Sequence, residues 1–144
     1  MIARVSAETI KPVWSTTLAE AVHSIAVSER TGRIAIGLED GTLVILSGAG
    51  GELLSSSKAH EMGFLSLAVS RDRFASSGPD GKVRLWDDNG RSTETIEAGG
   101  PWVQKVMWSP DGSKLLIAVG KRVRLWETGK GWTLNFAPQG GTVA

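Results

Sequence analysis

The side chains that could do chemistry in this chain are few. The sequence holds two histidines, His23 and His60, and no cysteine. Zinc sites combine cysteine and histidine ligands at short, regular spacings, and two widely separated histidines do not form such a set. The lack of cysteine also excludes disulfide bonds and thiolate catalysis. We therefore expect no metal ion and no other cofactor.

Other groups that can take part in catalysis stand where turns are expected. Ser70 and Ser109 each end a short apolar run, and no histidine or aspartate can be assigned as a base for either hydroxyl. The glycine-rich stretch 48–51 is not followed by a helix pattern, so it does not form a phosphate-binding loop. The acidic pairs at 39–40 and 87–88 indicate turns rather than calcium ligands. The sequence predicts a protein that is not an enzyme.

Composition and charge narrow the class of protein further. With 144 residues and 41% hydrophobic side chains, the chain can form one domain with a buried core. Sixteen basic against 15 acidic residues leave a net charge of +1, which gives no case for a nucleic-acid or membrane partner. The first residues lack the apolar core of a signal peptide, and no apolar run approaches the ~20 residues of a membrane span. We expect a soluble, cytoplasmic protein.

A repeat with a period near 40 residues organises the chain. The Asp80-Gly81 turn and Trp86 have counterparts 40 positions earlier in Asp40-Gly41 and 40 positions later in Trp126. Short apolar runs alternate with glycine-rich turns, and no segment has the 3.6-residue periodicity of a helix. The sequence therefore predicts an all-β protein built from repeated units.

Each repeat is expected to form four strands, the first three apolar and the fourth polar, as for the edge of a sheet. The units are predicted at about 22–57, 60–97 and 102–136, with an additional strand over about 13–18. The expected strands are 22–27, 33–38, 42–46 and 52–57, then 64–69, 73–77, 82–86 and 91–97, then 103–108, 114–119, 122–126 and 132–136.

The pattern resembles the WD40 repeats, a family of β-propellers with four-stranded blades. In the second unit, Ala59-His60 stands for the family's Gly-His, residues 64–70 for its first strand and residues 80–87 for its Trp-Asp ending. The third unit matches over 108–112 and 123–127, and the first only by spacing and its Asp-Gly turn. The resemblance covers about residues 13 to 136.

The resemblance implies a structural hydrogen-bond set within the second blade. The family often joins a His, a Ser, an Asp and a Trp, and His60, Ser76, Asp80 and Trp86 stand at the matching positions. Asp80 can accept from the imidazole, and the Ser76 hydroxyl can link the other ring nitrogen to the Trp86 indole. The other two repeats lack this set, for example with Gly120 in place of the aspartate.

The number of repeats predicts association. Closed propellers of this kind have ~4–8 blades, so three blades leave two open apolar flanks. A homodimer of six blades is the simplest closed solution, and a partner protein or a longer parent chain are the alternatives. In the dimer, residues 13–18 could form the outer strand on the last blade of the other subunit, an edge for which residues 132–136 compete.

The resemblance also implies a partner-binding face, where the loops between fourth and first strands and between second and third strands gather. Trp102 is the expected anchor of this face, because tryptophan is enriched at interface hot spots, unless it packs on the neighbouring blade instead. Pro101, Met62, Lys121 and Arg122 are its expected companions. The leading prediction is a non-catalytic scaffold that binds proteins. The alternatives are a ligand-binding or enzymatic propeller with an axial site formed between subunits, and a structural subunit of a hetero-complex.

Overall fold

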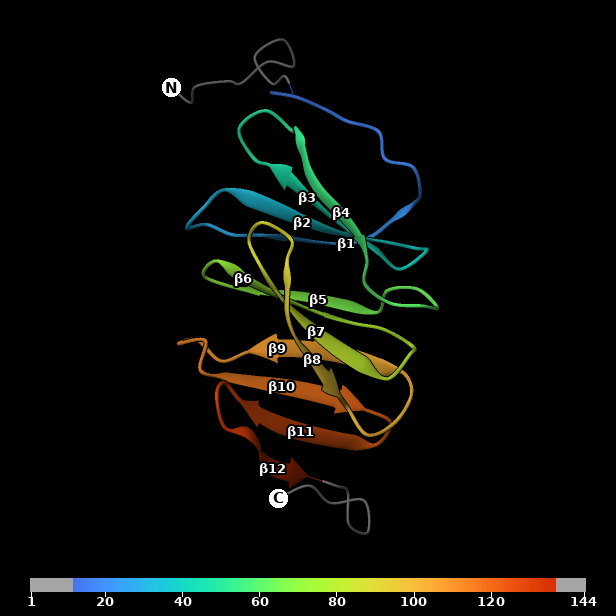
Figure 1. Ribbon diagram of the computed structural model, residues 1–144, viewed down its shortest axis with the longest axis vertical. Coiled ribbons are helices and arrows are strands. Elements are labelled where there is room, and N and C mark those ends of the chain that lie inside the picture. Colours follow the sequence, from blue (N-terminus) through green and yellow to red (C-terminus); the bar gives the residue numbers. More distant parts are fainter. Residues whose placement is uncertain (1–11, 137–144) are drawn as a thin grey trace, which may run out of the picture.

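Three four-stranded antiparallel sheets follow one another along the chain (Figure 1). The structure is a computed structural model that describes residues 12–136. The first sheet contains β1 (Val22–Val27), β2 (Arg33–Leu38), β3 (Thr42–Ser47) and β4 (Leu53–Lys58). The second contains β5 (Ser66–Ser70), β6 (Arg73–Ser77), β7 (Lys82–Asp87) and β8 (Ser92–Glu97). The third contains β9 (Val103–Trp108), β10 (Lys114–Val119), β11 (Arg122–Glu127) and β12 (Gly131–Phe136). The predicted all-β class and the three sheets are confirmed.

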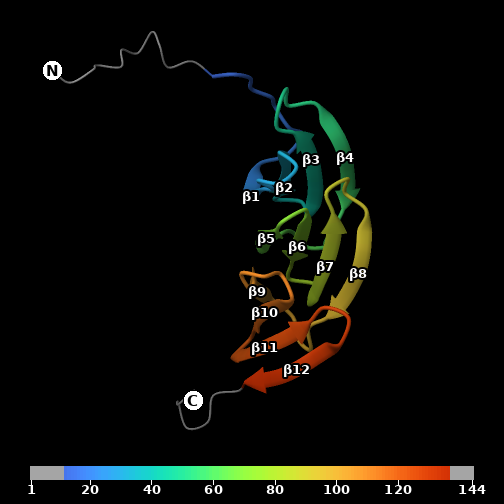
Figure 2. The same ribbon diagram turned by 90° about the vertical axis from the view of Figure 1, so that its left-hand side faces the viewer.

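Each sheet is a meander in which consecutive strands pair, so the spatial order equals the chain order. The first strands β1, β5 and β9 lie side by side on one side of the stack, and β4, β8 and β12 lie on the other (Figure 2). The fourth strands β4 and β8 are largely exposed, as their polar sequences predict. β1 is also mostly exposed despite its apolar sequence, because no strand of the described chain covers its outer side.

Two hydrophobic clusters hold the sheets face to face. Between the first and second sheets the core is built around Phe64 and Phe74, which are buried against Leu43, Ile45 and Trp86. A second cluster joins the second and third sheets, with members from β7, β9, β10 and β11. Burying one such aromatic or branched side chain contributes about 1.5–3 kcal/mol, which makes these faces the main source of stability.

Polar groups fix the register between neighbouring sheets. The Ser77 hydroxyl donates to the Val103 carbonyl at 2.8 Å, and the Val106 amide donates to the Ser66 hydroxyl at 3.2 Å. Each of these bonds joins the second sheet to β9, in an interior where an unpaired group would be costly. The apolar faces therefore meet in one defined alignment rather than sliding over each other.

The expected strand over residues 13–18 is not formed, and this part of the prediction is wrong. The segment crosses the outward face of the first sheet without pairing with a strand. Trp14 instead donates its indole N–H to the Gly48 carbonyl at 2.9 Å and places its ring against Gly51. Trp14 and Leu18 pack on a buried apolar cluster of that face, formed by Ile36, Leu38, Val44 and Leu46. The segment is thus held by burial of Trp14 and Leu18 on the face of the first sheet, and not by strand pairing at the edge of a sheet.

The Asp40-Gly41 turn requires glycine for two independent reasons. Gly41 has a φ of +93°, a region that L-residues with a side chain rarely adopt. A Cβ atom added there would lie 1.9 Å from the backbone oxygen of His60. Gly32 also has a positive φ, +73°, but a Cβ there would meet nothing within 4 Å.

Alanine variants of Gly32 and Gly41 distinguish the cost of backbone strain from the cost of a steric clash, because only Gly41 combines the two. We expect Gly32→Ala to lower the free energy of unfolding by about 1 kcal/mol, the cost of the left-handed conformation. Gly41→Ala should cost roughly 3 kcal/mol or more, because the loop that carries His60 must also move. Urea unfolding followed by tryptophan fluorescence measures both, and equal losses would contradict the clash described here.

Candidate functional site

The loops expected to bind a partner gather along one edge of the stack. The connections β4–β5, β8–β9 and β10–β11 all lie at the right-hand edge of the molecule in Figure 1. Met62 is 67% exposed and Trp102 is 57% exposed, and Pro101 and Lys121 also face solvent. Arg122 is half-buried. The five residues therefore share one edge of the stack.

The β8–β9 loop is the best-positioned part of this edge. The Trp102 amide donates to the Pro79 carbonyl at 3.2 Å, which ties the loop to the turn between β6 and β7. Arg122 donates to the Gly99 carbonyl at 2.5 Å from the other side. Pro101 and Trp102 lie on this loop, and Arg122, the first residue of β11, contacts it, whereas Met62 lies on the β4–β5 loop and Lys121 on the β10–β11 turn.

Trp102 combines exposure with an unusual backbone. Its φ is +61°, and Arg71 is the only other non-glycine residue with a positive φ among residues 12–136. Bulky residues avoid this conformation, so it persists only where the surroundings impose it, and such positions cluster at functional sites. With more than half of its surface exposed, the ring does not serve mainly to fill a space against the neighbouring sheet.

The four side chains of the hydrogen-bond set meet in the second sheet. His60 Nδ1 lies 3.0 Å from Asp80 Oδ1, and His60 Nε2 lies 2.9 Å from the Ser76 hydroxyl. The Trp86 indole donates to the same hydroxyl at 2.9 Å. The Asp80 carboxylate can only accept, so the imidazole carries its proton on Nδ1 and donates it to Asp80, and Nε2 in turn accepts from the Ser76 hydroxyl. One tautomer satisfies every group in the chain of bonds.

Burial decides the charge of this histidine. His60 is buried, and loss of water lowers the pKa of its imidazole below the ordinary value, while the attraction of Asp80 offsets this only in part. The ring is therefore neutral at pH 7, and it is enclosed perpendicular to the Phe64 ring, with the two ring centroids 5.4 Å apart. A neutral, enclosed imidazole with both nitrogens occupied is placed to hold the β4–β5 loop rather than to transfer protons to a substrate.

Comparison with known proteins agrees with this geometry. Residues 51–87, which run from just before β4 to the end of β7, match the family described as "WD domain, G-beta repeat", or WD40. The matched segment contains all four members of the hydrogen-bond set. This chain carries a WD40 repeat.

The chain is also similar to parts of two curated proteins. The chain is 36% identical over 102 residues to "Actin-interacting protein 1" of Drosophila melanogaster, a match that covers 65% of this chain and 16% of the relative. It is 30% identical over 97 residues to "Protein transport protein sec13" of Aspergillus clavatus, covering 50% of this chain and 33% of the relative. The chain thus corresponds to a third or less of the length of these relatives.

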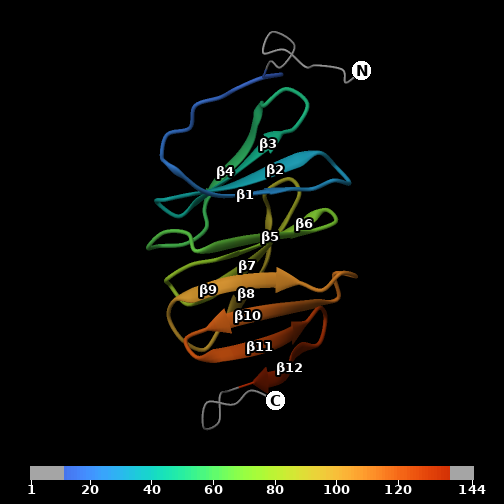
Figure 3. The same ribbon diagram turned by 180° about the vertical axis from the view of Figure 1, so that it is seen from behind.

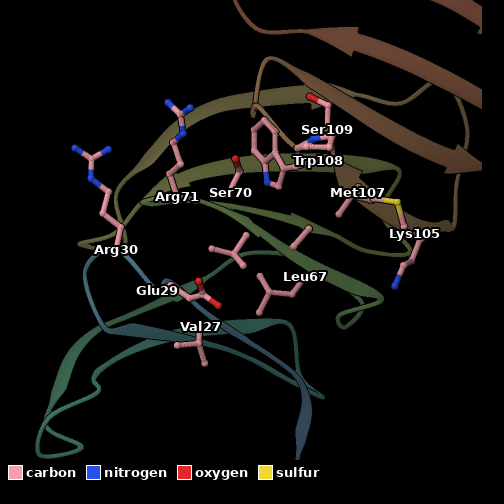
Figure 4. Close-up of a pocket in the computed structure, with 14 residues that line it drawn as sticks. Val27, Glu29, Arg30, Leu67, Ser70, Arg71, Lys105, Met107, Trp108 and Ser109 are labelled. Carbon is pink, nitrogen blue, oxygen red and sulfur yellow. The ribbon is translucent and has the colours of Figure 1, made fainter.

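The WD40 assignment leaves one feature of the structure unaccounted for. A cavity of about 770 Å³ opens between β1, β5 and β9 (Figure 4). It lies next to the turns β1–β2, β5–β6 and β9–β10, which are at the edge of the stack opposite to the β8–β9 loop (Figure 3). Sequence reasoning missed its residues, which include Arg30, Arg71 and Trp108. The available signal was a basic residue in the turn after the first strand of both the first and second repeats.

Other classes of site find little support in the described structure. Within residues 12–136, no group of three or more histidine, aspartate or glutamate side chains lies close enough together to hold a metal ion. The described part of the chain also has no helix long and apolar enough to cross a membrane.

Replacement of His60 by alanine tests the structural role. We expect His60→Ala to lower the free energy of unfolding at pH 7 by about 1–3 kcal/mol, because Ser76 and Asp80 lose a buried partner. The native protein should also lose stability as the pH falls below about 6.5, because the unfolded chain then binds a proton that the folded imidazole resists. Stability from this group is complete above that pH, and His60→Ala should flatten the slope between pH 7 and 5.5.

Urea unfolding at both pH values gives the measurement, and His23→Ala provides the matched control. His23 is exposed and contacts only the Ser24 hydroxyl through its side chain in the described structure. An unchanged stability of His60→Ala, with loss of partner binding instead, would contradict the structural role.

Trp102 allows a direct test of backbone strain at the exposed edge. Trp102→Gly and Trp102→Ala remove the same ring, but only glycine is free of the cost of a positive φ. We expect the glycine variant to be more stable than the alanine variant by about 1 kcal/mol in urea unfolding. Equal stabilities would mean that the loop relaxes and that the conformation of Trp102 is not imposed by its neighbours.

Proposed function

We propose that this chain is a non-catalytic scaffold that binds other proteins and completes its propeller by pairing with a second copy. WD40 repeats and relatives that contain them support a protein-interaction role in general terms. The single observation that carries the more specific proposal is the uncovered apolar face of the third sheet. A protein of 15.3 kDa without cysteine suits the cytoplasm, and we propose that location.

The outward face of the third sheet is apolar across three strands. Met107 on β9 pairs directly with Leu116 on β10, and Val123 on β11 pairs with Ala118. Met107, Leu116 and Val123 are 53%, 40% and 40% exposed. The opposite face of the same sheet is buried in the core with the second sheet. A sheet of this kind gains free energy when a further sheet covers the exposed face.

The outward face of the first sheet differs because residues 14–18 cover it in part. An apolar cavity of about 620 Å³ remains between this segment and the sheet, lined by residues that include Val22, Ile25 and Ile34. Val22 and Ile25 are exposed. The two flanks are thus both apolar but unlike in shape, and we infer that each pairs with the other flank rather than with its own copy.

This asymmetry favours a closed pair of chains. If the third sheet of one chain meets the first sheet of another, a two-fold axis produces the same contact twice and leaves no flank open. The ring then contains six sheets, within the range of ~4–8 blades for closed propellers. The edge that carries Trp102 stays accessible in this arrangement and supplies the surface for a different protein.

Light scattering coupled to size-exclusion chromatography tests the pairing. We expect a mass of twice 15.3 kDa for the native chain. Met107→Glu and Leu116→Glu should each return the mass toward one chain, because a carboxylate buried at the contact is strongly unfavourable.

Met62→Glu is the matched control, since Met62 is even more exposed than Met107 and Leu116 but lies at the loop edge. It should leave the mass unchanged. A stable native monomer of 15.3 kDa would contradict self-association and would favour the role of a subunit docked in a hetero-complex.

A further inference from the structure

We propose that the cavity between β1, β5 and β9 binds an acidic peptide segment of another protein, at a second site separate from the loop of Trp102. The cavity lies at the opposite edge of the stack, next to the turns β1–β2, β5–β6 and β9–β10. All of its lining residues come from one chain, so the proposal does not depend on the pairing of two copies.

The size and lining of the cavity suit a peptide. Its volume of about 770 Å³ falls within the usual ~300–1,000 Å³ of ligand-binding pockets. The three first strands contribute apolar side chains to its floor, among them Val27, Leu67, Val69 and Val106. Val27 is exposed, while Leu67 and Val69 are half-buried, so part of this apolar surface remains open to an occupant. A simple inorganic anion would leave most of this surface uncovered.

The charged groups around the cavity select a negative occupant. Arg30, Arg71 and Lys105 line it, against the single carboxylate of Glu29. Figure 4 shows Arg30 and Arg71 side by side at one end and Lys105 at the other, with the apolar side chains between them. An occupant that reaches both ends needs more than one carboxylate, with an apolar side chain in the middle. A short peptide segment in which acidic and apolar residues alternate is complementary to this arrangement of cationic and apolar side chains.

Trp108 supplies an unused hydrogen-bond donor beside the cavity. The side chain is only 9% exposed, and its Nε1 has no hydrogen-bond partner within the part of the chain that the structure describes. In Figure 4 the nitrogen is on the ring edge that faces Ser70 and the middle of the cavity. The Arg73 guanidinium stacks on the ring at 4.6 Å and donates to the Gly112 carbonyl at 2.6 Å, which holds the indole in place.

A buried hydrogen-bond donor without a partner, such as Trp108 Nε1, is uncommon in proteins and often marks a functional position. A carboxylate oxygen that enters the cavity would be attracted by the nearby cations, and a small movement of the side chains over Nε1 would let it accept this hydrogen bond. The Trp108 indole therefore gives both a reason for binding and a signal by which binding can be observed.

The backbone of Arg71 is the second unusual feature of this site. Its φ is +56°, and its carbonyl accepts a hydrogen bond from the Ser28 hydroxyl of the first sheet. This bond ties the β5–β6 turn to the end of β1, beside Glu29 and Arg30. Conformations of this kind are retained where the position of a residue matters, and here the turn places Arg71 beside Arg30 at one rim of the cavity.

Nuclear magnetic resonance of ¹⁵N-labelled protein tests the proposal. The probe is an acetylated and amidated pentapeptide, Glu-Leu-Glu-Leu-Glu, and the matched control peptide has lysine at each glutamate position. The chain has six tryptophans, and Trp108→Phe identifies the indole N–H signal of Trp108. We expect the acidic peptide to shift this signal progressively, while the indole signal of Trp102 at the opposite edge stays unchanged.

Variants of the cationic rim complete the experiment. Arg71→Glu combined with Lys105→Glu should weaken binding at least tenfold, whereas Arg91→Glu, an exposed arginine on the turn before β8, should leave it unchanged. Trp108→Phe should weaken binding about threefold or more, because the ring remains but the donor is lost. The same titration on Leu116→Glu separates this site from the pairing of chains, since binding should persist in a monomer.

Several results would overturn the proposal. A Trp108 signal that the acidic peptide does not move would do so, as would equal binding of the lysine peptide. Tighter binding of a single-stranded oligonucleotide than of the acidic peptide would show that the site recognises nucleic acid instead. Equal affinities of the native chain and the rim double variant would mean that Arg71 and Lys105 take no part.

Discussion

Contact between the apolar faces of successive sheets is the constraint on which this protein depends. A single four-stranded sheet has two faces, and strands such as β2, β3 and β10 are apolar enough to need cover on both. The chain meets this need internally twice, between the first and second sheets and between the second and third. It does not meet it at the two ends of the stack. The interior contacts explain the fold, and the ends explain why we expect the chain to associate.

The two ends resolve the same problem in different ways. At the first sheet, Trp14 and Leu18 reach across the face and leave an apolar cavity beside them. At the third sheet, Met107, Leu116 and Val123 remain exposed within the described chain. The two edges of the stack are also unlike, with Trp102 on one and the cationic rim of Arg30 and Arg71 on the other. One small β-protein thereby presents four chemically different surfaces.

The sequence predicted the parts of this structure that repeat. Strand and turn signals at a period near 40, with Asp-Gly turns and Trp86 and Trp126 in register, were sufficient to locate twelve strands within a few residues. The set of His60, Ser76, Asp80 and Trp86 could be named because each has a fixed place in the repeat. Residues 13–18 were predicted as a strand because their β-branched side chains suit one. In the structure, burial of Trp14 and Leu18 on the face of the first sheet determines the path of this segment instead. The cavity was missed because its residues come from three strands that no local pattern brings together.

The segment that carries Trp14 has a kinetic consequence. A second chain that approaches the first sheet finds Trp14 and Leu18 already packed there, with the indole bonded to Gly48. Full docking of another sheet requires these side chains to leave first, so an internal step precedes the bimolecular encounter. At high protein concentration the rate of assembly would then reach a plateau set by release of the segment, rather than rise in proportion to concentration. In the proposed pairing the segment would therefore act as a latch that must open before the two chains can dock.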